Sequence, residues 1–60
     1  MPDYRLYYFS GRHIERAQAF VAPHDAAAID EAGRRAGGSC AEIWRGAIRL
    51  KVFNAPDGWT

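Results

Sequence analysis

The sequence has a single cysteine, almost no net charge and no long apolar run, and each absence excludes a class of protein. Cys40 alone cannot form an intrachain disulfide, whereas small secreted domains usually depend on several. Eight basic and seven acidic residues give a net charge of +1 with no block of either sign, which argues against a basic nucleic-acid tail. The apolar runs are far too short to span a bilayer, and no signal peptide is visible. We therefore expect a cytoplasmic protein with no membrane partner.

Large apolar side chains are also scarce. Hydrophobic residues fill 29 of the 60 positions, but eleven of them are alanines and only eighteen are larger. A domain of this size buries only about 60% of the surface that its unfolded chain exposes. The eight aromatic residues and the near-neutral charge indicate a folded chain rather than a disordered one. The composition therefore predicts one small domain, residues 1–60, with a marginal core, for which self-association would provide further burial.

Local patterns occur in the order strand, strand, helix, strand, strand. Residues 4–9 are rich in aromatic, β-prone side chains, Ser10-Gly11 is a turn signal, and residues 13–22 form a second extended stretch. The alternation of that second stretch is imperfect, and a β-bulge that the sequence does not locate would shift its register. Two more extended runs surround Gly46, and residues 54–60 are expected to form a loose tail whose tryptophan can pack back onto the body.

The alanine-rich stretch 26–36 predicts the helix. Asp25 is well placed as its N-cap, and Gly37 suits the left-handed position just after its end. The helical spacing of one buried face is shown by Ile29, Ala32, Gly33 and Ala36. The fold class is therefore α+β: a small two-layer domain with an antiparallel sheet and one helix on one face. The strand order stays open.

One helix covers only one side of such a sheet, so the composition of the other side matters. We expect Leu6, Ile43, Ile48, Leu50 and Val52 to point toward the helix. Strand alternation then places large aromatic and basic side chains on the opposite side, together with the carboxylate of Glu42. This predicted interaction surface consists of Arg5, Tyr7, Phe9, Trp44, Arg49, Lys51 and Phe53.

Three interpretations of this surface are open. Aromatic residues and arginine are enriched at protein interfaces, so the surface is typical of a self-associating module, most simply a homodimer. An unpaired edge strand could equally recruit another protein by strand addition, as a small adaptor or inhibitor would. The alternative is a single-stranded RNA or DNA platform, in which bases stack on the aromatics. The near-neutral charge favours protein over nucleic acid, and long basic side chains could also simply shield the aromatics in a monomer.

The sequence offers no catalytic, metal-binding or cofactor-binding constellation. His13 and His24 lack further ligands nearby, whereas structural zinc needs four. Cys40 follows Gly37-Gly38-Ser39 at a predicted strand start, and a lone cysteine is more often a small core side chain than a nucleophile. We therefore expect a non-catalytic protein with no cofactor.

Several short stretches resemble a family of short uncharacterised bacterial proteins. The resemblance lies in residues 4–9, Tyr-Arg-Leu-Tyr-Tyr-Phe, followed by a turn, the pair His13-Ile14, an alanine-rich helix and the stretch 41–46, Ala-Glu-Ile-Trp-Arg-Gly. It covers roughly residues 3–52, although Arg12 stands where that family usually has glycine before the His-Ile pair. The resemblance implies a small bacterial domain of unknown function and provides no catalytic residue.

Overall fold

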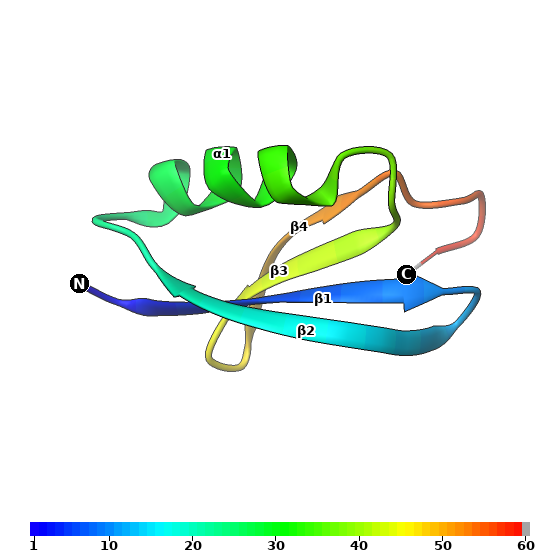
Figure 1. Ribbon diagram of the computed structural model, residues 1–60, viewed down its shortest axis with the longest axis horizontal. Helices are drawn as coiled ribbons and strands as arrows, with labels where there is room; N and C mark the ends of the chain where they lie inside the picture. The colour runs from blue at the N-terminus through cyan, green and yellow to red at the C-terminus, as the bar shows by residue number, and fades with distance from the viewer. Residues whose placement is uncertain (60) are drawn as a thin grey trace.

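The computed structural model describes residues 1–59 and contains four strands and one helix. They are β1 (Asp3–Ser10), β2 (His13–Val21), α1 (Asp25–Ala36), β3 (Ala41–Arg45) and β4 (Ile48–Phe53). The strands form one antiparallel sheet in the order β2-β1-β3-β4, and α1 lies along one face of it (Figure 1). The predicted α+β fold and element order are confirmed.

Strands β1 and β2 form a hairpin that contains a bulge. Gly11, with φ of +63°, provides the left-handed conformation that the turn requires. Tyr8 lies opposite Arg16, but Phe9 lies opposite Ile14, so Glu15 is the extra residue of the bulge. The bulge changes which side chains of β2 face the helix, and this is the irregularity that the imperfect alternation indicated.

Strand β3 connects the first hairpin to the second. Leu6 of β1 pairs with Ile43 of β3 at the centre of the sheet, and both side chains are fully buried. A second bulge follows, because Ile43 lies opposite Lys51 whereas its neighbour Trp44 lies opposite Arg49. Leu50 is therefore the extra residue in β4.

The core lies between the sheet and α1. It consists of Tyr4, Leu6, Tyr8, Ala22, Ala28, Ala32, Ala36, Ala41 and Ile43. Three of the five alanines of α1, Ala28, Ala32 and Ala36, form its buried face, and their small side chains let the helix approach the sheet closely. Gly33 allows the same approach, since a Cβ at this position would lie 3.3 Å from the ring of Phe53. The predicted helix face is confirmed in part, because Ile29 and Gly33 are only half-buried and Ala28 belongs to the core.

Two of the five side chains expected to point toward the helix do not pack in the core. Leu6, Ile43 and Leu50 pack there as predicted. Ile48, however, is 52% exposed near the turn, and Val52 lies opposite Glu42 on the other side of the sheet. The bulge at Leu50 turns Val52 to the other side, because one extra residue reverses the alternation beyond it. Ile48 lies opposite Arg45 at the start of β4, next to the turn.

The helix begins one residue earlier than predicted, and its N-cap is His24 rather than Asp25. The ring nitrogen Nδ1 of His24 accepts a hydrogen bond from the backbone N–H of Ala27, at 3.1 Å. The carboxylate of Asp25 accepts instead from the hydroxyl of Tyr4, at 2.8 Å, and from the guanidinium of Arg45, at 3.0 Å. Asp25 therefore fastens the first turn of α1 to strands β1 and β3.

These contacts change the acidity of the two partners in opposite directions. The hydrogen bond from Tyr4, with the guanidinium of Arg45 next, holds the pKa of Asp25 below its usual range. Burial, with the hydrogen bond to Asp25 next, raises the pKa of Tyr4. Both shifts favour the ionised carboxylate beside a neutral phenol. No helix in residues 1–59 has the length and apolar content needed to cross a membrane.

Candidate functional site

The side of the sheet opposite α1 is called the open face here. Strand register assigns residues from all four strands to it: Asp3, Arg5, Tyr7, Phe9, Ile14, Ala17, Ala19, Val21, Glu42, Trp44, Arg49 and Val52. Its centre is polar. Glu42 is 7% exposed, the one buried charged residue among those the structure describes. Because an unpaired buried carboxylate is costly, its partners decide how this face is built.

Two indoles and a guanidinium satisfy the carboxylate of Glu42. Oxygen Oε1 accepts from Nε1 of Trp44 at 3.0 Å. Oxygen Oε2 accepts from Nε1 of Trp59 at 2.9 Å and from the guanidinium of Arg49 at 3.2 Å. Both oxygens are therefore engaged, and the rings that donate to them also cover them. Glu42 organises the aromatic side chains of the open face.

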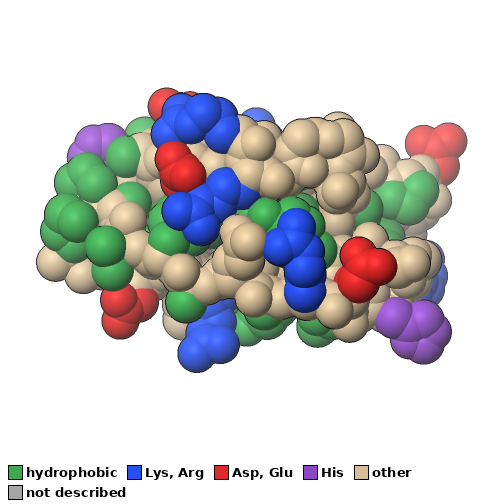
Figure 2. All heavy atoms as spheres, in the orientation of Figure 1, with side chains coloured by type: hydrophobic (Ala, Val, Ile, Leu, Met, Phe, Trp, Pro, Cys, Tyr) green, Lys and Arg blue, Asp and Glu red, His purple; other side chains and the backbone are tan. Residues whose placement is uncertain are grey.

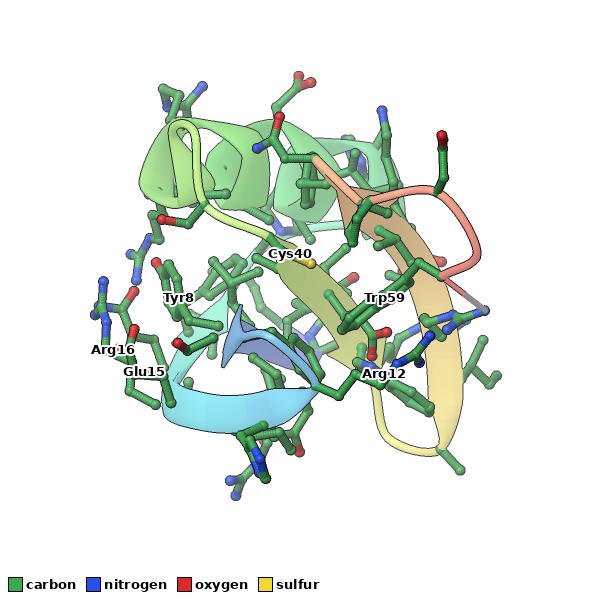
Figure 3. The ribbon with its side chains drawn as sticks, turned by 90° about the vertical axis from the view of Figure 1, so that its right-hand side faces the viewer. Tyr8, Arg12, Glu15, Arg16, Cys40 and Trp59 are labelled. Atoms are coloured by element: carbon green, nitrogen blue, oxygen red, sulfur yellow. The ribbon has the colours of Figure 1, made fainter. Side chains whose placement is uncertain are left out.

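Trp59 comes from the segment after β4, which returns toward the end of β1 (Figure 1). Its ring meets that of Phe9 edge to face, with centroids 4.9 Å apart, and the guanidinium of Arg12 lies 5.6 Å from its centroid. Figure 3 shows Arg12 next to Trp59, and Arg16 next to Tyr8, as two separate groups. The expected packing of Trp59 onto the body is thus confirmed, and residues 54–59 are not simply loose.

A groove lies beside this cluster on the open face. Its volume is about 340 Å³, and it is lined by Tyr7, Phe9, Ile14, Glu42, Trp44 and Gly46. The ring of Trp44 meets that of Tyr7 edge to face, with centroids 6.5 Å apart. Such edge contacts orient aromatic rings and are stabilising beyond their buried area. The groove therefore has fixed aromatic walls.

Five of the seven residues of the predicted interaction surface lie together on the open face: Arg5, Tyr7, Phe9, Trp44 and Arg49. The prediction was wrong for Lys51 and Phe53. Phe53 packs against Gly33 of α1, and Lys51 lies opposite Ile43 with its Nζ 5.4 Å from the Phe53 ring centroid. The bulge in β4 turns both side chains to the helix side, which simple alternation could not show.

Sequence reasoning missed the contribution of β2 to the open face. Four apolar side chains of this edge strand, Ile14, Ala17, Ala19 and Val21, lie on it and are exposed. Ile14 is 57% exposed and Val21 is 52% exposed. The signal was the imperfect alternation of β2, because placing the bulge at Glu15 brings all four side chains into one row.

Charges on the open face are balanced rather than basic. Asp3 and Arg5 are both exposed near the start of β1. Arg49 is paired with Glu42, and Lys51 lies on the other side. On the side that Figure 2 displays, along α1 and the outer edge of β2, basic and acidic side chains are interspersed as well.

The remaining candidate residues have local roles. His13 pairs with Ser10 next to the turn, and His24 caps α1. Cys40 is half-buried rather than buried, and burial, with the negative charge of Glu42 next, raises the pKa of its thiol. A raised pKa favours the thiol over the more nucleophilic thiolate. Within residues 1–59, no three His, Cys, Asp or Glu side chains are grouped so that they could hold a metal ion.

Comparisons of the chain with protein-family models, curated proteins and solved structures give no match. The resemblance to the short bacterial family stays a prediction, and the function has to be argued from the open face itself.

Proposed function

We propose that the chain is a non-catalytic protein-interaction module that pairs with a second copy of itself through the open face. The observation that carries the proposal is the groove between Tyr7, Phe9 and Trp44, which lies on the side that α1 does not cover. Glu42 supports the non-catalytic part, because both of its oxygens already accept hydrogen bonds. Its role is to hold the aromatic walls of the groove in place.

The surface shape of the open face suits pairing with a second copy. Tyr7 lies opposite Ala17, and Arg5 lies opposite Ala19, so large side chains of β1 stand directly beside small ones of β2. A two-fold axis between two open faces can set the large side chains of one copy over the small ones of the other. Facing sheets pack about 10 Å apart when side chains interdigitate in this way.

The charges of the open face also suit a second copy better than a nucleic acid. Asp3 and Arg5 alternate on β1, so an antiparallel copy can place each acid opposite a base. Nucleic acid would instead need a surface of one sign to displace counterions from the phosphates. Because Lys51 lies outside the open face and Arg49 is paired with Glu42, such a surface is weak here.

The size of the molecule sets what such a dimer must bury. A standard interface buries about 800 Å² on each partner, which is about a fifth of the 3861 Å² surface of this chain. The molecule measures 32 × 19 × 18 Å, so a pair must use most of one long side. Both the groove and the exposed row of β2 would then be covered, and we expect association in the micromolar range.

Sedimentation velocity over a concentration series tests the proposal with a matched pair of variants. Ala17 and Ala26 are both exposed, the first on the open face and the second on the helix. A17E places a charge in the hollow beside Tyr7 and is expected to weaken association about tenfold or more, because an unpaired charge would be desolvated in the interface. A26E makes the same change of charge on α1 and should leave association unchanged.

Several outcomes would overturn the proposal. A wild-type chain that stays monomeric at high concentration does not self-associate. Association that persists in A17E lies elsewhere, for example along the outer edge of β2. Tight binding of mixed single-stranded oligonucleotides at low salt, weakened in Arg5→Ala, would assign the open face to nucleic acid instead.

A further inference from the structure

The side chain of Trp59, in the segment after β4, occupies a site on the open face that is built by other parts of the chain. We call this site the seat. The seat consists of Phe9, Arg12 and Glu42, and Trp59 occupies it. Phe9 meets the indole edge to face, Arg12 lies over the ring, and Glu42 accepts the indole N–H at 2.9 Å. The seat thus recognises an indole through its shape, its π-surface and its one hydrogen-bond donor.

The connection to the seat is a short tether that begins at a fixed point. The side-chain amide of Asn54 donates to the backbone carbonyls of Gly37 and Ser39, both at 2.9 Å, which anchors the tether to the end of α1. Within the described residues 1–59, the one backbone hydrogen bond of the tether beyond Asn54 is internal to the tether: the N–H of Trp59 donates to the carbonyl of Pro56. Positive φ values at Asn54 and Gly58 give the tether its two bends.

We propose that in the self-associated form Trp59 exchanges between copies, so that the tail of each chain fills the seat of the other. This inference rests on the proposed function. Five residues from the anchor to the indole reach at most about 17 Å when extended, whereas two packed sheets lie about 10 Å apart. The tether is therefore long enough to cross between two stacked open faces.

Exchange replaces each contact of the seat by an identical contact from the partner, which is the basis of domain swapping. A short tether holds its own indole near the seat at an effective concentration that is typically millimolar for short linkers. Within a dimer the partner's tether provides a comparable concentration, so the two arrangements differ little in free energy. The exchanged tails add a tryptophan anchor from each copy, and tryptophan is among the residues that contribute most to interfaces.

A complementation experiment tests the exchange. The tail variant, Trp59→Ala, keeps the seat but has no indole to donate. The seat variant, Phe9→Ala with Arg12→Ala, keeps the indole but has a damaged seat. Neither variant can exchange with itself, but the tail of the seat variant can fill the seat of the tail variant. We expect the mixture to associate about tenfold more tightly than either variant alone.

The outcomes separate the exchange from the proposed function. If the mixture associates no more tightly than the tail variant alone, the copies pair through the open face without exchange, and the inference fails alone. If no form associates at all, the proposed function fails as well. Circular dichroism of each variant shows whether the sheet is still formed.

A peptide assay keeps the inference testable should the seat variant not fold. A fluorescently labelled peptide of residues 54–60 is titrated into Trp59→Ala, and binding is followed by anisotropy. We expect saturable binding, at least about tenfold weaker in wild type because the tethered indole competes. Adding Arg12→Ala to the tail variant should weaken the peptide about two- to fivefold, the range of an exposed cation–π contact. Absence of binding to Trp59→Ala would overturn the inference.

Discussion

The two sides of the sheet are stabilised in different ways. On the helix side, Leu6 and Ile43 are fully buried, and alanines of α1 pack on them. On the open face the buried side chain is a carboxylate, Glu42, covered by the indoles of Trp44 and Trp59. Apolar burial has no direction, whereas hydrogen bonds do. The stability of the helix side therefore depends on how fully its side chains fill the core, whereas the stability of the open face depends on the position of the Glu42 carboxylate.

The largest expected effect comes from removing volume on each side with the same substitution. Ile43→Ala leaves a cavity under α1 and should lower the free energy of unfolding by about 2–5 kcal/mol. Ile14→Ala changes a side chain on the open face that is 57% exposed, and should change that free energy by less than about 0.5 kcal/mol. Urea unfolding of both variants provides the measurement. Equal losses would mean that the two sides contribute alike.

The second prediction removes the acceptor of the open face. Glu42→Ala leaves two indole donors and Arg49 without their partner, and should cost about 1–3 kcal/mol of unfolding free energy. The loss should be smaller in Glu42→Gln, which keeps one acceptor oxygen. Glu15→Ala, at the exposed bulge of β2, is the control. Urea unfolding followed by tryptophan fluorescence would contradict the prediction if Glu42→Ala and the control were equally stable.

The third prediction concerns how α1 ends, on which the packing of the helix side depends. Gly37 has φ of +57°, and its N–H donates to the carbonyl of Gly33 at 3.2 Å. Gly37→Ala should lower the free energy of unfolding by about 1–2 kcal/mol, because a Cβ is disfavoured at positive φ. The neighbouring Gly38 is not among the positive-φ residues, so Gly38→Ala is the matched control. Thermal unfolding that shows equal losses would disprove a special role of Gly37.

The smallest effect is a dependence on pH at the helix start. Because the pKa of Asp25 is lowered in the folded state, its carboxylate stabilises the fold above the usual carboxyl range. That stabilisation is lost as the pH falls through the lowered pKa. Asp25→Asn should therefore be less stable than wild type near pH 7, and the difference should shrink below about pH 4. Asp30→Asn, on the exposed side of α1, is the control; a constant difference across this pH range would contradict the assignment.

The sequence predicted the fold because its signals were local. The turn at Gly11, the alanine-rich helix and the stop at Gly37 each depend on a few neighbouring residues. The helix start was one residue off, since His24 caps the helix while Asp25 bonds to Tyr4 and Arg45. Those partners are distant in the sequence, and no local pattern announces them.

The candidate site was predicted less completely, because face assignment is not local. Two bulges, at Glu15 and Leu50, each reverse the alternation of a strand. They turned Phe53 toward α1 and brought Ile14 onto the open face. The side chains of β1 were assigned to the correct face, because the extra residue of the β1–β2 pair, Glu15, lies in β2 and not in β1.

The pairing of β1 with β3 also has a kinetic consequence. Each hairpin joins strands separated by a short turn, whereas Leu6 and Ile43 meet only after the chain has closed a long loop around α1. Hairpins form in about 1–10 μs, and closing longer loops costs more chain entropy. We expect the meeting of the two hairpins to limit the folding rate. In stopped-flow experiments, Leu6→Ala should then mainly slow folding, and so should substitutions that weaken either turn, because both hairpins are already formed when they meet.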